Sequence, residues 1–287
     1  MEISALTGIV TPLVTPLTSD ESIDLVSLRR LVELQLLHGI TGLWVMGTTG
    51  EFAAFSEDER ASAVEAVVEQ TAGRAPVIAN VSDAATRLVV RHARRAEDAG
   101  ADAVAVTPPY YYPHSQSELL AHYRTVASAT RLPVFIYNIP QTVRVRVELA
   151  TAVQLAEEGT VAGIKDSQND LEWFRELTVK LEASQPAFRP FAGTRHLIDA
   201  AVLAGAVGAI PSLANSHPEL CVAAYTAAAA GDLAGAHLAQ TEIVRIEASV
   251  QANRGSKNAA VIGALKERLR DAGVIEGAGL SGPLLSS

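Results

Sequence analysis

One lysine stands where the sequence otherwise predicts an apolar strand. The chain has only four lysines, and Lys165 closes the strand-like run Val161–Lys165, directly before a turn signal. When burial lowers its pKa, a lysine can lose its proton and attack a carbonyl carbon, which an arginine cannot do. An isolated strand lysine more often extends its ammonium to solvent. Because Gly163, Ile164 and an apolar neighbouring strand surround Lys165, we favour a Schiff base between this residue and a 2-oxo acid.

A tyrosine lies at the end of the preceding strand-like run. Tyr137 belongs to the run Val134–Asn138. A tyrosine in a buried strand is usually a core residue whose hydroxyl is satisfied locally. Since neighbouring parallel strands end at the same face of a sheet, we expect Tyr137 and Lys165 to be neighbours there. A phenol beside an imine can relay protons during carbinolamine formation and carbon–carbon bond cleavage.

The segment Gly47–Glu51 has the sequence GTTGE and follows another strand-like run. It would be an ordinary turn if nothing else accompanied it. The adjacent hydroxyls of Thr48 and Thr49, with the glycine-exposed amides that begin at Gly47, can instead hold a carboxylate and hydrogen-bond a catalytic phenol. Glu51 is interpreted as structural, bonding the amides of the loop or a neighbouring hydroxyl. A further loop, Tyr110–Tyr112, carries three consecutive tyrosines, which more often mark an interface than a catalytic group.

Short apolar runs alternate with amphipathic helical patterns along the chain, and this alternation predicts a (β/α)8 TIM barrel. An open, doubly wound sheet is the alternative, but no glycine-rich nucleotide turn follows the first strand. The predicted strands are Gly8–Leu13, Gly42–Met46, Pro76–Asn80, Ala103–Thr107, Val134–Asn138, Val161–Lys165, Arg189–Ala192 and Val207–Pro211. The predicted helices between them are Leu25–His38, Glu57–Thr71, Ala84–Ala99, Gln116–Ala129, Val147–Glu157, Leu171–Ala183 and Thr194–Ala204.

Helix caps and a surplus of C-terminal helices complete this prediction. Ser56 with Glu59, and Ser115 with Glu118, have the spacing of capping boxes. Three further helices are predicted after the eighth strand, at Pro218–Ala230, Asp232–Gln251 and Lys257–Ala272, and an irregular end at Gly277–Ser287. One helix closes the barrel, so the surplus forms a C-terminal helical extension. We expect a barrel over residues 1–215 and C-terminal helices over 216–287, packed together as a single structural unit.

Composition and charge exclude several classes of function. A net charge of −9 argues against nucleic-acid binding, and the basic cluster Arg91–Arg95 fits a solvated helix face. The single cysteine, Cys221, excludes an intramolecular disulfide and a thiolate zinc site. The predicted strand ends carry no acidic or histidine cluster at metal-ligand spacing, so we expect no metal and no cofactor. No apolar window has the roughly 18 residues of a membrane helix, and the N-terminus lacks a basic signal region, which favours the cytoplasm.

Taken together, Gly47–Glu51, Tyr137–Pro140 and Gly163–Asp166 resemble the dihydrodipicolinate synthase / N-acetylneuraminate lyase family over nearly the whole chain. The resemblance implies a (β/α)8 barrel with C-terminal helices, assembled as a homotetramer from two tight dimers. It also implies that Lys165 forms an imine with pyruvate or a pyruvate-derived substrate and that Tyr137 is the general acid and base.

The same resemblance gives roles to residues on other strand ends. Thr48 and Thr49 match the pair that binds the pyruvyl carboxylate and joins the proton relay. Tyr111 is similar to a tyrosine donated across the dimer interface to complete that relay. Gly193 and Ile210 match positions that line the substrate cavity.

One departure from the family pattern bears on the substrate. Dihydrodipicolinate synthases carry an arginine two residues after the proline of the Tyr-Asn-x-Pro motif, where this chain has Thr142; Arg144 lies two positions further on. A threonine hydroxyl does not replace a bidentate arginine. Since the loop Lys165–Gln168 also resembles that of the 2-keto-3-deoxy sugar acid aldolases, we expect cleavage of such an acid to pyruvate and an aldehyde, with Thr142 bound to a substrate hydroxyl.

Several alternatives remain open. Within the family they are 4-hydroxy-tetrahydrodipicolinate synthase, N-acetylneuraminate lyase, and a keto-acid dehydratase or hydratase-aldolase. A barrel that only binds a ligand is the non-enzymatic alternative, but binding alone does not require a lysine placed to form an imine.

Overall fold

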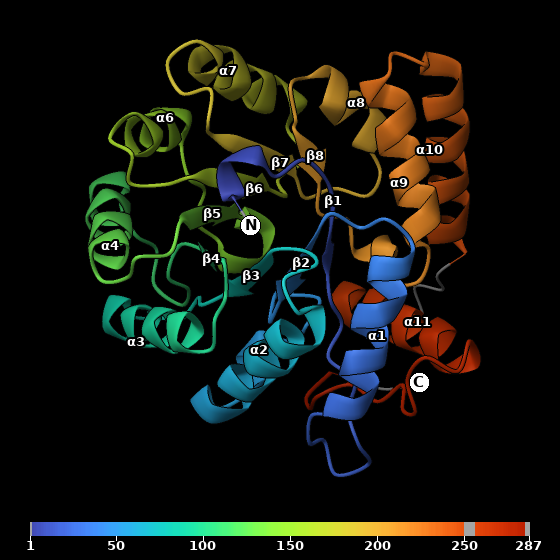
Figure 1. The fold of residues 1–287 in the computed structure, drawn as a ribbon. Coiled ribbons are helices and arrows are strands. Elements are labelled where there is room, and N and C mark those ends of the chain that lie inside the picture. Colours follow the sequence, from blue (N-terminus) through green and yellow to red (C-terminus); the bar gives the residue numbers. More distant parts are fainter. Residues whose placement is uncertain (1, 250–255, 285–287) are drawn as a thin grey trace.

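A computed structural model describes residues 2–249 and 256–284 (Figure 1). Eight parallel strands form a closed barrel in which each strand pairs with the next and β8 pairs with β1. The strands are β1 (Gly8–Pro12), β2 (Gly42–Val45), β3 (Val77–Asn80), β4 (Ala103–Val106), β5 (Val134–Asn138), β6 (Gly163–Asp166), β7 (Arg189–Ala192) and β8 (Gly208–Ala209). The (β/α)8 prediction is therefore confirmed.

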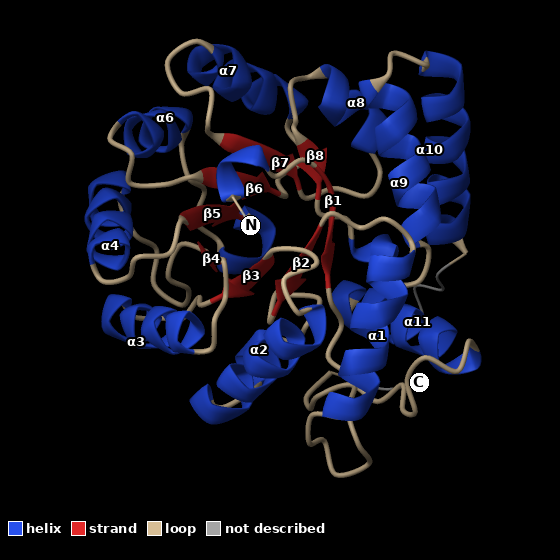
Figure 2. Ribbon diagram, in the orientation of Figure 1, coloured by secondary structure: helices blue, strands red, loops and turns tan. Residues whose placement is uncertain are grey.

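A ring of helices surrounds the strands and buries their outer faces, as Figure 2 shows. These helices are α1 (Leu25–Leu37), α2 (Glu57–Thr71), α3 (Thr86–Asp98), α4 (Gln116–Ser128), α6 (Leu149–Glu157), α7 (Leu171–Glu182), α8 (Ile198–Leu203) and α9 (Pro218–Ala229). Both predicted capping boxes are present, at Ser56 before α2 and at Ser115 before α4. Each cap satisfies backbone amides that the first helical turn leaves without partners.

The interior of the barrel is a second, smaller apolar core. Its large members include Trp44, Phe135 and Phe191, and the short helix η1 (Ile3–Ala5) closes it from the N-terminal side of the strands (Figure 1). Side chains along a strand alternate between faces, so on β6 Ile164 packs outward while Gly163 and Lys165 point inward. A Cβ atom at Gly163 would lie 2.4 Å from the ring of Phe135, so glycine is required where the bulky interior residues meet.

Several element bounds differ from the prediction, mainly beside the carboxyl ends of the strands. Residues 194–197 are not helical: Thr194 Oγ1 accepts from the amide of His196, and this local bond competes with the first helical turn. The short helices α5 (Pro140–Val143), η2 (Phe52–Ala54) and η3 (Ser212–Asn215) were not predicted, because three or four residues give no periodic pattern.

The C-terminal helices pack on one side of the barrel. The first, α9, contacts β1 and α8, while α10 (Leu233–Ala248) packs against α9 and α8 (Figure 1). The predicted continuation of α10 through residues 250 and 251 lies outside the described residues. The next helix, α11 (Lys257–Asp271), contacts η3, and residues 277–284 after it are irregular, as predicted. The division into residues 1–215 and 216–287 stays a prediction.

Candidate active site

Lys165 lies at the carboxyl end of β6, inside the mouth of the barrel. The residue is only 4% exposed. Its Nζ lies 4.2 Å from the ring centroid of Tyr137 and 4.9 Å from that of Trp44. Burial among these rings lowers the pKa of Lys165 to about 7, with no charged group among the causes. Near neutral pH, a large fraction of the protein molecules therefore carry Lys165 as the free amine.

Tyr137 faces Lys165 from the adjacent strand. The two residues are register partners in the β5–β6 pair, as the sequence predicted. The phenol donates to Thr48 Oγ1 at 3.2 Å, and its ring packs edge-on against Trp44 at 5.4 Å between centroids. Burial raises the pKa of Tyr137 to about 12, and hydrogen bonding with the side chains of Thr48 and Ser167 partly opposes this rise. The phenol thus keeps its proton at neutral pH and is bonded to a hydroxyl that can pass a proton on.

The turn Gly47–Glu51 brings Thr48 to this phenol. Its shape depends on contacts below it: Thr15 Oγ1 donates to the carbonyl of Gly50 at 2.7 Å, and a Cβ atom at Gly47 would lie 3.0 Å from the indole of Trp44. Gly47 is buried beneath the turn, and Thr48 is half-buried above it. Gly47 therefore acts through the path of the backbone.

A cavity of about 170 Å³ unites most of the predicted site residues. Its lining includes Lys165, Tyr137, Thr48, Thr49, Thr142, Gly193 and Ile210. A Cβ atom at Gly193 would clash with the hydroxyl of Ser167, so a larger residue between the ends of β6 and β7 requires that side chain to move. Lys165, Tyr137 and the three threonines Thr48, Thr49 and Thr142 therefore line one small space.

Tyr111 is the predicted site residue that a single chain does not bring to Lys165. It is 86% exposed, has a positive φ of 87°, and packs edge-on against Tyr112. It lines a separate surface cavity together with Thr142 and Arg144. Its donation to a neighbouring subunit stays a prediction.

Three polar contacts around the site were not anticipated. Asn138 Nδ2 donates to Asp166 Oδ1 at 2.7 Å and ties the ends of β5 and β6 together. Burial raises the pKa of Asp166 to about 7. We expected the side chain of Glu51 to bond the amides of its own loop or a neighbouring hydroxyl. It instead bonds the ammonium of Lys266 and the amide of Ser281. The first contact could have been predicted, because Asn138 and Asp166 directly follow Tyr137 and Lys165 at the ends of adjacent strands. No local sequence pattern predicts the contacts of Glu51.

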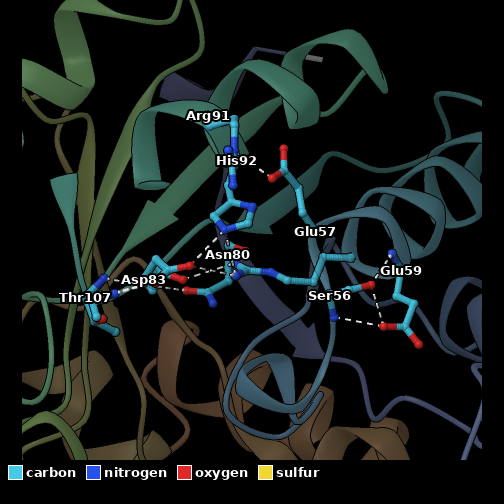
Figure 3. A network of polar contacts seen from close by, with 11 residues as sticks. Ser56, Glu57, Glu59, Asn80, Asp83, Arg91, His92 and Thr107 are labelled. Atoms are coloured by element: carbon cyan, nitrogen blue, oxygen red, sulfur yellow. Dashed lines mark hydrogen bonds and ion pairs between the residues drawn. The ribbon is translucent and has the colours of Figure 1, made fainter. Parts of the chain in front are cut away.

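A second polar network supports the neighbouring strand ends (Figure 3). Arg60 of α2 donates to the carbonyl oxygens of Asn80 and Ser82, each at 3.1 Å, and its guanidinium lies 5.2 Å from the centroid of the Phe52 ring. His92 belongs to the same network, because its Nε2 lies 3.0 Å from Oδ2 of Asp83. The network fixes the loop after β3 and the helix η2 that follows Glu51.

The predicted solvated face at Arg91–Arg95 is only partly correct. Arg91 forms an ion pair with Glu57 of α2 (Figure 3), and Arg95 pairs with Asp58, both at the surface. His92, between them, is buried in the network described above.

The described residues contain no group of three or more His, Cys, Asp or Glu side chains placed to bind a metal ion. Nor does any helix within them have the length and apolar character needed to cross a membrane.

Comparisons with known proteins agree on the relationship of this chain. The model of the Dihydrodipicolinate synthetase family matches residues 5–287. A 4-hydroxy-tetrahydrodipicolinate synthase of Acidiphilium cryptum is 38% identical over 237 residues, which covers 83% of this chain and 80% of that protein. An uncharacterized DapA-like lyase of Halobacterium salinarum is 36% identical over 268 residues, covering 93% of this chain and 86% of that protein.

Solved structures give the same result. The dihydrodipicolinate synthase of Bacteroides thetaiotaomicron has a TM-score of 0.93 at 33% identity, covering 100% of this chain and 95% of that one. A prophage protein of the dihydrodipicolinic acid synthase family from E. coli K12, solved in complex with pyruvate, has a TM-score of 0.90 at 25% identity, with 97% and 92% covered. The chain therefore belongs to the dihydrodipicolinate synthetase family and is an enzyme of its pyruvate-dependent aldolase and lyase class.

Proposed function

We propose that the protein is a class I aldolase that cleaves a 2-keto-3-deoxy sugar acid to pyruvate and an aldehyde through an imine at Lys165. The observation that carries the imine is the buried Lys165 amine, which lies over the ring of Tyr137 and has burial alone as the cause of its lowered pKa. An uncharged amine at neutral pH is the form that attacks a carbonyl carbon.

The proposed reaction begins when the Lys165 amine attacks C2 of the 2-oxo acid. Tyr137 delivers a proton to the departing hydroxyl of the carbinolamine, and water leaves as the iminium forms. The hydroxyls of Thr48 and Thr49 and the backbone amides of the turn that begins at Gly47 hold the carboxylate. Gly193 and Ile210 also line the cavity.

Carbon–carbon cleavage follows from the same groups. Tyr137, as the phenolate left by the previous step, accepts the proton of the C4 hydroxyl while the C3–C4 bond breaks and its electrons enter the iminium. The aldehyde leaves and an enamine remains on Lys165. Protonation at C3 and hydrolysis then release pyruvate and restore the amine. No cofactor is part of this scheme.

Borohydride reduction in the presence of pyruvate tests the imine. Peptide mass mapping should find an adduct with the mass of a reduced pyruvyl imine on Lys165. The three other lysines, Lys180, Lys257 and Lys266, serve as internal controls in the same digest. An unmodified Lys165 would refute the mechanism.

The substrate preference rests on Thr142, which lines the Lys165 cavity from α5. Arg144, the nearest arginine in the sequence, instead lines the outer cavity beside Tyr111. The Thr142 hydroxyl can hydrogen-bond a hydroxyl of a polyol tail, whereas Arg195 and Lys257, which line the same cavity, offer positive charge to a carboxylate. A panel of 2-keto-3-deoxy sugar acids, N-acetylneuraminate and aspartate semialdehyde, assayed at equal enzyme concentration, tests this preference.

A second candidate function is favoured by the relatives, several of which are named 4-hydroxy-tetrahydrodipicolinate synthase. In that reaction pyruvate bound to Lys165 condenses with aspartate semialdehyde. Equal or higher turnover with aspartate semialdehyde in the panel would establish this function in place of the first.

The assembly and compartment are part of the proposal. We infer a homotetramer built from two dimers, in the cytoplasm, with Tyr111 reaching the partner's cavity. The exposed Tyr111–Tyr112 pair supports an interface at this loop. Light scattering of the purified protein and of a Tyr111→Phe variant tests the state of assembly and the contribution of this loop to it.

A further inference from the structure

A second lysine is buried more completely than Lys165. Lys266, on α11, has a side chain that is 0% exposed, and its Nζ lies 2.6 Å from Oε1 of Glu51. The same ammonium donates to the carbonyl oxygen of Gly279 at 2.7 Å. The other carboxylate oxygen of Glu51 accepts from the amide of Ser281 at 2.7 Å. One ion pair thus joins α11, the C-terminal segment and the turn that begins at Gly47.

A buried ion pair of this kind contributes little net stability, because both charges lose their hydration. What it does supply is geometry: each charge must remain opposite the other, so the two segments cannot shift independently. The pair therefore sets the position of the turn relative to α11. Asn258 and Ile262 of α11 also line the Lys165 cavity, which places α11 in the wall of the site.

The backbone of Glu51 is hydrogen-bonded directly to that of Thr48. The amide of Glu51 donates to the carbonyl oxygen of Thr48 at 3.1 Å, which closes the turn, and Glu51 itself has a left-handed φ of 57°. Thr48 Oγ1 in turn accepts from the phenol of Tyr137 at 3.2 Å. A continuous path of bonds runs from Lys266 through Glu51 and Thr48 to Tyr137.

We propose that Lys266 and Glu51 are positioning residues that hold the Thr48 hydroxyl in hydrogen-bond contact with Tyr137. Neither side chain lines the Lys165 cavity, so both act through the turn. The proposal rests on the proposed function of Tyr137 and Thr48 in proton transfer. A merely structural pair would fasten the C-terminal segment and affect stability alone.

The test compares Lys266→Met, Glu51→Gln and the double variant, all as the full chain. Lys266→Met leaves a carboxylate buried without its partner, so its melting temperature should fall. The double variant carries no charge at either position of the pair and should recover much of that loss. If the pair positions Thr48, the turnover number of the double variant should stay about 10- to 100-fold below wild type even though its stability recovers. KM should rise as well, because the same turn holds the carboxylate.

A matched control separates positioning from general loosening. Leu265→Ala removes a buried side chain of α11 next to Lys266 without touching Glu51. It should lower the melting temperature while the turnover number stays within about twofold of wild type. Recovery of both stability and turnover in the double variant, or an equal loss of turnover in Leu265→Ala, would overturn the proposal. If Lys266→Met alone does not fold, the double variant and Glu51→Gln still decide the question.

Imine trapping distinguishes failure of this proposal from failure of the proposed function. Wild type and the double variant should both be trapped with pyruvate at Lys165 by borohydride. Absence of trapping in wild type would refute the proposed function itself. Normal trapping in wild type, with full turnover in the double variant, would remove only the positioning role of Lys266 and Glu51.

Discussion

Two buried lysines in this protein differ in what surrounds the ammonium. Lys266 has a carboxylate at 2.6 Å and a backbone carbonyl at 2.7 Å. Lys165 has aromatic rings instead, and burial is the sole cause of its lowered pKa. Burial lowers the pKa of Lys266 as well, but Glu51 opposes the shift. The comparison indicates that burial makes a lysine nucleophilic only where no counter-ion retains its proton.

The largest expected effect comes from replacing each lysine by methionine. Lys165→Met removes the nucleophile, so aldolase activity and borohydride trapping should both fall to background. The same variant removes an amine that is costly to bury, so its free energy of unfolding should equal or exceed that of wild type. Lys266→Met should instead lose about 3–5 kcal/mol, because it leaves Glu51 unpaired. Urea unfolding of both variants measures the difference, and shifts of the same sign would contradict the comparison.

Removal of the phenol that faces Lys165 should have the next largest effect. Tyr137→Phe should lower the turnover number by about 10²–10⁴ and leave pyruvate binding largely intact, since the ring remains over the amine. Tyr123→Phe is the matched control, because this buried tyrosine donates only to the carbonyl of Val106 at 3.0 Å. It should cost about 1 kcal/mol of stability and leave turnover unchanged. Equal losses of turnover in the two variants would argue against proton transfer by Tyr137.

The lowered pKa of Lys165 predicts two pH effects. Since the free amine reacts, kcat/KM should fall about tenfold per pH unit below a midpoint near 7. Between about pH 7 and the ordinary lysine pKa of 10.5, the unfolded chain holds a proton on this residue that the folded chain lacks. This group therefore makes the free energy of unfolding rise with pH across that window. Lys165→Met should lack this contribution, and urea titrations at pH 7 and 9 would reveal an unchanged slope if the assignment were wrong.

A smaller effect is expected at the cavity wall. Thr142→Arg introduces a bidentate carboxylate ligand where the chain has a hydroxyl, so selectivity should move toward aspartate semialdehyde by about tenfold in the ratio of kcat/KM values. Thr142→Val, which removes the hydroxyl and adds no charge, should weaken sugar-acid cleavage without favouring aspartate semialdehyde. An unchanged ratio in Thr142→Arg would show that residue 142 does not select the substrate.

The neighbours of Lys165 could be predicted from the sequence, but the ion pair of Lys266 could not. Lys165 and Tyr137 are neighbours because both end adjacent parallel strands, which follows from chain order and the two-residue period of a strand. Lys266 lies in an ordinary helical pattern, and its partner Glu51 is distant in the chain. Their meeting depends on how α11 packs on the barrel, which no local pattern records. The irregular segment 194–197 has a local cause, the bond from the His196 amide to Thr194 Oγ1, which a helical pattern does not reveal.

Trp44 gives the site an optical signal of its own. Its indole is fully buried and lies edge-on to Tyr137 and 4.9 Å from the Lys165 amine. The chain has only one other tryptophan, Trp173, whose ring lies 5.8 Å from the guanidinium of Arg146 on the outside of the barrel. In a Trp173→Phe background, tryptophan emission would report from inside the barrel alone. Protonation of Lys165 or its conversion to an imine would then be visible as a fluorescence change in stopped flow, without any added label.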